Sequence, residues 1–83
     1  MRYTVVWSET AILQLAAIYN AASDRNAVSA AQHQIDRSLR INPPTNADPD
    51  TGQCTIDILP LRATYEVADL DRLVRVLTLE RIP

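Results

Sequence analysis

Residues Leu61–Ala68 read LRATYEVA, and the fold of the rest of the sequence is predicted outward from this segment. Apolar and mostly polar side chains alternate along this segment, which is the period of a half-buried strand. One set is Leu61, Ala63, Tyr65 and Val67, and the other is Arg62, Thr64, Glu66 and Ala68. The pattern predicts a strand whose first set faces a core and whose second set faces away from it.

Two further strand patterns flank this segment. In Cys54–Leu59 the residues Ile56 and Ile58 fall on one face, whereas Arg72–Ile82 is apolar on both faces, as in a central strand. Asp69–Asp71 is typical of the turn before this last strand. Because the connections are short, we expect the three strands to form an antiparallel meander.

The N-terminal half predicts one strand and two helices. Tyr3–Trp7 is β-branched and aromatic, and Ser8 can cap a first helix over Glu9–Ala22. A second helix follows Ser23-Asp24. Apolar residues recur at helical spacing at Ile12, Leu15, Tyr19 and Ala22, and again at Val28, Ala31, Ile35 and Leu39. We expect an antiparallel helix hairpin, with Trp7 and Tyr19 in the core.

The expected fold is a two-layer α+β domain in the order β-α-α-β-β-β, spanning residues 1–83 as a single domain. The helix hairpin packs on one face of an antiparallel four-stranded sheet. The strand order is 1-4-3-2, because a last strand that is apolar on both faces calls for a neighbour on each edge. Asn42–Gly52 contains three prolines and the only glycine, so it forms a surface loop.

Composition and charge exclude several classes of function. The 83 residues carry eight arginines, no lysine and ten acidic residues, for a net charge of −2. This charge argues against a large phosphate-tracking surface, and the missing lysine excludes Schiff-base chemistry. One cysteine excludes a disulfide framework and a multi-cysteine metal site, and no metal or cofactor is expected. The sequence has neither an apolar run near 18 residues nor a signal core, so we expect a cytoplasmic protein that does not contact membranes.

The sheet face without helices is the candidate site. Arginines seldom point into a small core, so alternation along the last strand places Leu73, Arg75, Leu77, Leu79 and Arg81 on this face. Neighbouring strands add Thr55, Asp57, Arg62, Thr64 and Glu66. The charged residues fit cross-strand ion pairs on a solvated face. The two leucines Leu77 and Leu79 fit a partner surface better.

The element order and the segment Leu59–Val67 resemble the RelE/ParE toxin superfamily, also called plasmid-stabilisation proteins. These are the toxin halves of bacterial type II toxin–antitoxin pairs. Trp7-Ser8, before an alanine-containing helix pair, is similar to the end of the family's first strand. The resemblance covers nearly the whole chain and implies a toxin-family component that a small antitoxin protein neutralises.

The resemblance implies different activities for different branches. RelE-like members are ribosome-dependent mRNA endonucleases that hold the scissile phosphate with basic residues on the open sheet face. Arg62 and Arg81 match places of functional arginines in that branch and are the catalytic candidates. Thr55 and Asp57 stand where active nucleases carry other residues, so the basic catalytic set is incomplete and enzymatic activity is left open.

Two alternatives need no nuclease residues. ParE-like members inhibit DNA gyrase, and a third type of member is a non-toxic interaction module that keeps the fold. The expected partners are therefore an antitoxin and either the ribosome with its mRNA, DNA gyrase or neither. In every case the antitoxin is expected to bury apolar surface such as Leu77 and Leu79, with Arg75 beside them.

Overall fold

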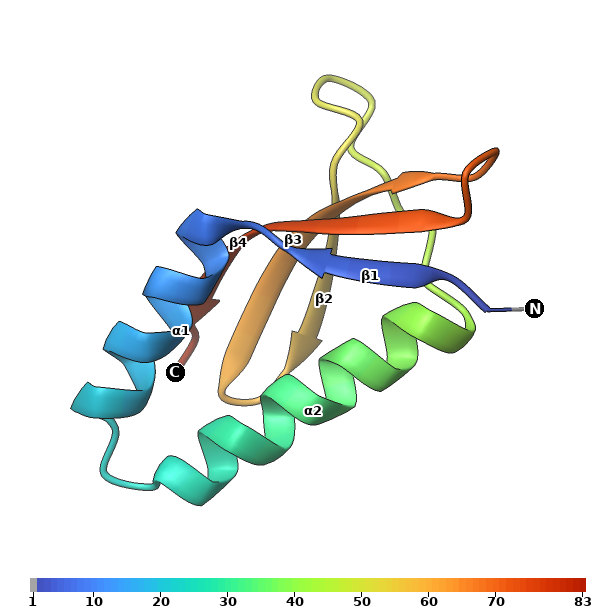
Figure 1. Ribbon diagram of the computed structural model, residues 1–83. Helices are drawn as coiled ribbons and strands as arrows, with labels where there is room; N and C mark the ends of the chain where they lie inside the picture. The colour runs from blue at the N-terminus through green and yellow to red at the C-terminus, as the bar shows by residue number, and fades with distance from the viewer. Residues whose placement is uncertain (1) are drawn as a thin grey trace.

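The computed structural model describes residues 2–83, in which two helices pack on a four-stranded sheet (Figure 1). The elements are β1 (Thr4–Trp7), α1 (Glu9–Ala21), α2 (Arg25–Ile41), β2 (Cys54–Ile58), β3 (Leu61–Ala68) and β4 (Leu73–Arg81). The strands lie in the order β1-β4-β3-β2. The predicted α+β class, element order and strand order are confirmed.

The sheet is mixed, so the expectation of a purely antiparallel sheet is wrong. β2, β3 and β4 form the antiparallel meander, but β1 pairs with β4 in parallel. The helices cause this, since they return the chain to the end of the sheet where β1 starts, and the Tyr3 N–H donates to the Arg40 carbonyl at 2.7 Å. β2 therefore runs in the direction of β1, and two hairpin reversals give β4 that direction again.

The helices begin at the predicted caps and then diverge. The Ser8 hydroxyl accepts from the Ala11 N–H at 3.0 Å, and the Asp24 carboxylate accepts from the Ala27 N–H at 3.1 Å. α1 packs along β4, whereas α2 contacts β1, β2 and β3. Figure 1 shows the two helices spreading apart from the turn that joins them. The predicted helix hairpin is present, but it is an open one because each helix packs on its own part of the sheet. Neither described helix is long and apolar enough to cross a membrane.

The core lies between the helices and the predicted apolar side of β3. The sheet contributes Val5, Cys54, Leu61, Ala63, Tyr65, Val74, Val76 and Leu79, and the helices contribute Ala11, Val28, Ala31, Ile35 and Leu39. Cys54 is buried, and burial raises the pKa of its thiol, which disfavours the reactive thiolate. Tyr65 is fully buried and its hydroxyl donates to the Pro44 carbonyl, which provides the partner that a buried phenol needs.

A β-bulge in β4 reverses the side-chain alternation of its second half. Tyr65 pairs with Val76, and the register then shifts by one residue, which leaves Leu77 as the extra residue. Side chains beyond such an insertion change face. Leu79 therefore lies opposite Ala63 in the core and is only 2% exposed, so its predicted place on the open side of the sheet is wrong.

α1 replaces a neighbouring strand along this second half of β4. β1 ends at Trp7, opposite Val76. Beyond that point the Ser8 hydroxyl donates to the Leu77 carbonyl at 2.8 Å, and the Gln14 side chain accepts from the Leu79 N–H at 2.7 Å. These contacts satisfy strand groups that have no partner strand on this side, as buried backbone requires.

Asp36 ties β1 to α2. The Trp7 indole N–H donates to one carboxylate oxygen at 3.0 Å, and Arg40 Nε donates to the other at 2.7 Å. The second contact is an ion pair between residues four positions apart on α2. Burial raises the pKa of Asp36, but the bonds from Arg40 and Trp7 outweigh it and hold that pKa below its usual value. Trp7 is half-buried at this junction rather than enclosed in the core.

Candidate functional site

The sheet face opposite the helices carries rows of polar side chains. Cross-strand partners share a face of a sheet, so the register aligns the residues of neighbouring strands. The rows are Asp57, Arg62 and Glu80; Thr55, Thr64 and Thr78; and Glu66 and Arg75. We call the surface formed by these residues the open face.

Arg62 is held by carboxylates on both neighbouring strands. Its Nε and Nη2 atoms donate to the two oxygens of Asp57 at 2.7 and 2.8 Å, and Nη1 lies 3.8 Å from Glu80. The hydrogen bonds from Arg62 hold the pKa of Asp57 below its usual value, and the same contact raises the pKa of Arg62. This bidentate geometry occupies the donors that would otherwise face a phosphate.

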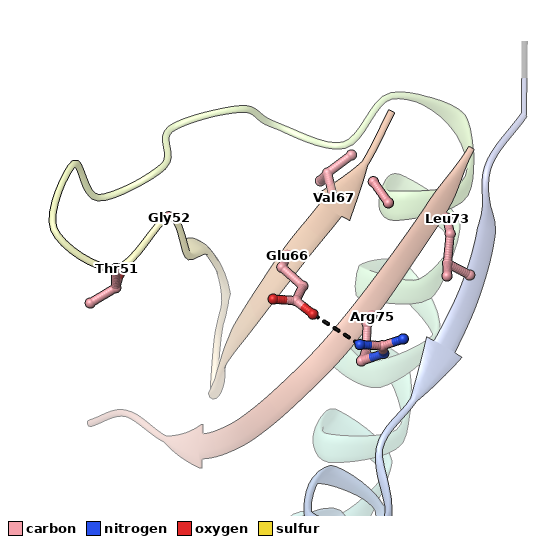
Figure 2. Close-up of a pocket in the computed structure, with 7 residues that line it drawn as sticks. Thr51, Gly52, Glu66, Val67, Leu73 and Arg75 are labelled. Atoms are coloured by element: carbon pink, nitrogen blue, oxygen red, sulfur yellow. Dashed lines mark hydrogen bonds and ion pairs between the residues drawn. The ribbon is translucent and has the colours of Figure 1, made fainter. Parts of the chain in front are cut away.

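Arg75 forms the second ion pair of the open face, with Glu66 at 3.1 Å. This pair lines a pocket of about 320 Å³ together with Leu73 and Val67. Figure 2 shows the Glu66 and Arg75 side chains meeting between β3 and β4. Thr51 and Gly52, from the loop after α2, also line the pocket. An anion entering here would have to compete with the Glu66 carboxylate for Arg75.

The predicted ion pairs are confirmed, but the predicted catalytic pair is divided between two sides of the sheet. Arg62 lies on the open face, whereas Arg81 lies opposite the buried Leu61 and therefore on the helix side. Arg81 lines a separate pocket of about 290 Å³, with Ser23 and Asp24 from the turn between the helices. The expectation that the two arginines project together is wrong, because the bulge at Leu77 lies between Arg75 and Arg81 and turns Arg81 to the opposite side of the sheet. Their catalytic roles stay predictions.

The three predicted partner residues do not all lie exposed on the open face. Arg75 is exposed on the open face as expected, but Leu79 is buried and Leu77 is half-buried at the bulge. Their roles in partner binding stay predictions. The two leucines do not form the exposed pair that alternation predicted.

The larger exposed apolar surface lies on α1. Ile12, Leu13 and Tyr19 are 53%, 62% and 41% exposed. An apolar groove of about 310 Å³ runs between the two helices, lined by Ile12, Leu15, Ala16, Tyr19, Asn20, Ser29 and Gln32. We call this the helix groove. The prediction that Tyr19 lies in the core is wrong, because α1 turns Ala11 toward the sheet instead.

The sequence contained a signal for the helix groove that the helical spacing alone did not reveal. α1 reads ETAILQLAAIYNA and carries large apolar side chains over much more than one narrow stripe, at Ile12, Leu13, Leu15, Ile18 and Tyr19. A helix with one covered face needs only a stripe of them. The surplus in α1 therefore indicates a second apolar face.

The described charged and thiol side chains do not gather into a metal site. Within residues 2–83, no group of three or more His, Cys, Asp or Glu residues could hold a metal ion. His33 is exposed on α2, whereas Ile35 on the same helix is buried.

No protein-family model matches the sequence, and no curated protein sequence matches it either. Solved structures do resemble the fold. A chain of the chromosomal ParDE toxin–antitoxin system from P. aeruginosa superposes with a TM-score of 0.76 at 19% identity, covering 99% of this chain and 98% of that chain.

Two further structures extend this likeness. A chain of the RelBE2 toxin–antitoxin complex from Mycobacterium tuberculosis has a TM-score of 0.70 at 16% identity, covering 98% of this chain and 99% of that chain. The isolated E. coli RelE toxin has a TM-score of 0.66 at 14% identity, with coverage of 98% and 85%. The chain therefore has the fold of the RelE/ParE toxin superfamily, as the resemblance predicted.

Proposed function

We propose that this chain is a single-domain, cytoplasmic toxin-family component of a type II toxin–antitoxin pair and that a small antitoxin binds its helix groove. The fold supports the first part, since several of its structural neighbours come from ParDE and RelBE toxin–antitoxin systems. The observation that carries the second part is the apolar surface of α1, where Ile12, Leu13 and Tyr19 stay exposed beside an apolar groove.

The physics of the groove favours a protein partner. Fully burying one large apolar side chain contributes about 1.5–3 kcal/mol, and these three residues are each about half exposed. Covering them together would supply several kcal/mol of that order. Gln32 and Ser29 add polar groups along the α2 side of the groove, which suits an amphipathic helix that lays its apolar face into it.

We expect Ile12→Asp, combined with Tyr19→Asp, to weaken antitoxin binding by about 100-fold or more, because both residues line the helix groove and charges would enter the desolvated centre of the interface. The antitoxin to test is the product of a short reading frame adjacent to the gene, and calorimetry measures its affinity. Leu70→Asp is the matched control, since Leu70 is fully exposed in the turn between β3 and β4. Equal affinities for both variants would reject the helix groove as the antitoxin site.

Among the activities open to this fold, the open face disfavours the endonuclease. Arg62 is engaged by Asp57 and Glu80, and Arg75 is engaged by Glu66, so each guanidinium already has a carboxylate. Phosphoryl-transfer sites instead leave cationic donors free to meet charge that develops on the reacting phosphate. Arg81, which has no ion pair within residues 2–83, lies on the other side of the sheet.

Induction of the chain in a bacterium, with transcript ends mapped by sequencing, distinguishes these activities. We expect growth arrest without ribosome-dependent cleavage and an unchanged arrest for Arg62→Ala. Loss of DNA supercoiling during the arrest would identify gyrase as the target. Cleavage that disappears in Arg62→Ala would establish the endonuclease instead, and growth without arrest by folded protein would leave the non-toxic interaction module.

A further inference from the structure

β2 forms one edge of the sheet, with only β3 beside it. An edge strand presents unpaired N–H and C=O groups at every second residue, and these groups invite another strand. In β2 the backbone N–H and C=O groups of Thr55 point away from β3, as the contacts described below show. The backbone groups of Asp57, two residues later, point the same way. Natural proteins usually protect such an edge.

One asparagine side chain occupies the first of these positions. The Thr55 N–H donates to Asn46 Oδ1 at 3.3 Å, and Asn46 Nδ2 donates to the Thr55 carbonyl at 3.2 Å. In a hydrogen-bonded antiparallel pair, two residues exchange both of their backbone bonds. A carboxamide has the same donor and acceptor as a peptide unit, so Asn46 acts as a one-residue substitute for a neighbouring strand.

The loop that carries Asn46 is fixed at both of its ends. Near α2, Pro43 is buried and the Pro44 carbonyl accepts from the Tyr65 hydroxyl. Near β2, the Asp48 N–H donates to the Gln53 carbonyl at 2.8 Å. Asn46 lies between these anchors, and its two bonds are the contacts that hold the middle of the loop against the strand.

The opposite edge of the sheet is covered more fully. Val5 of β1 is buried, and the Trp7 indole is bonded to Asp36 of α2. α2 thus contacts the β1 edge through Trp7 and through the Tyr3 N–H, which donates to the Arg40 carbonyl, whereas the loop contacts the β2 edge. Release of Asn46 would open β2 without changing these contacts of β1.

We propose that Asn46 is a latch that keeps the β2 edge closed, and that the released edge pairs with β2 of a second copy of this chain. An antiparallel pair centred on Ile56 brings Thr55 of each copy opposite Asp57 of the other. Each Thr55–Asp57 pair exchanges two backbone hydrogen bonds, so all outward groups of both residues are satisfied in both copies.

The side chains of β2 suit this register. The two Asp57 carboxylates lie opposite threonines instead of each other, and each is already held by Arg62 of its own chain at 2.7 Å. On the other face, Cys54 of one copy lies opposite Ile58 of the other, and the two Ile56 side chains meet at the centre. An apolar layer therefore continues from one copy into the next.

The test compares Asn46→Ala with the wild type and with Asn42→Ala, which removes the same carboxamide from the start of the loop. Hydrogen exchange is measured at single amides, and mass is measured by light scattering over a concentration series. In dilute Asn46→Ala we expect the Thr55 amide to exchange at least 10-fold faster than in both controls. At high concentration we expect a dimer of Asn46→Ala alone, in which the Thr55 and Asp57 amides are protected.

A second substitution identifies the surface. Asp57→Pro removes an outward N–H that the proposed dimer needs but that the β2–β3 ladder does not use, and edge strands tolerate proline. Placed on Asn46→Ala, it should restore the monomer. Unchanged Thr55 exchange in Asn46→Ala, a persistent monomer, or a dimer that survives Asp57→Pro would each overturn the proposal. If Asn46→Ala unfolds, Asn46→Asp is used, which keeps the acceptor for the Thr55 N–H and loses only the donor to its carbonyl.

Discussion

Replacing Leu79 with alanine is expected to lower the free energy of unfolding by about 2–5 kcal/mol. The side chain is 2% exposed and lies opposite Ala63 in the core, so its removal leaves a cavity that the sheet cannot readily fill. Urea denaturation followed by circular dichroism measures the change. Leu70→Ala is the control, because a fully exposed leucine should change the stability by about 0.5 kcal/mol or less.

This experiment also tests the bulge. If β4 alternated without interruption, Leu79 would lie on the same face as Arg75, and its substitution would cost as little as that of Leu70. A small effect at Leu79, with a large effect at the neighbouring Thr78→Ala, would contradict the register described above. The stability changes of Leu79→Ala and Thr78→Ala together therefore test both the bulge and the burial of Leu79.

The sequence predicted best where one physical rule acted alone. On β3, strict alternation placed Leu61, Ala63 and Tyr65 toward the helices, and all three are buried. On α2, polar residues surround one apolar stripe, and its positions Val28 through Leu39 all reach the core. The ion pairs Asp57–Arg62 and Glu66–Arg75 also followed from the alternation of β2, β3 and the first half of β4.

The errors arose where a tertiary contact overrode a local pattern. The extra residue Leu77 has no local signature, because its carbonyl is satisfied by Ser8, which lies far away in the sequence. Leu79 and Arg81 changed sides as a result. The antiparallel sheet was wrong for a similar reason, since the direction of β1 depends on where α2 delivers the chain and not on the residues of β1.

The helix groove shows a different limit. Helical spacing correctly placed Ile12 and Tyr19 on a similar side of α1. Spacing alone cannot distinguish a side that packs on the core from a side that is left exposed for a partner. The two cases differ only in what lies opposite, and in this fold Ala11 and Gln14 face β4 instead. A helix whose large apolar side chains exceed one narrow stripe should therefore be read as having two functions, packing and binding.

Raising the pH from 10 to 12 is expected to remove about 2 kcal/mol of stability through Tyr65 alone. Burial, with a smaller contribution from the nearby Cys54, raises the pKa of Tyr65 to about 12 in the folded chain. The ordinary value is 10.0, which applies after unfolding. Below pH 10 both states keep the proton and the stability is complete. Above pH 10 only the unfolded chain releases it, so the stability falls until the folded pKa is reached.

Tyr65→Phe isolates this effect. The variant should be about 0.5–1.5 kcal/mol less stable near pH 8, because the hydrogen bond to the Pro44 carbonyl is lost. Between pH 10 and 12, however, it should lose correspondingly less stability than the wild type. Burial also raises the pKa of the Cys54 thiol, so the comparison is made with Cys54→Ala in both chains. Urea midpoints at pH 8, 10, 11 and 12 give the two curves, and parallel curves would mean that the Tyr65 hydroxyl ionises as readily in the folded chain as in the unfolded one.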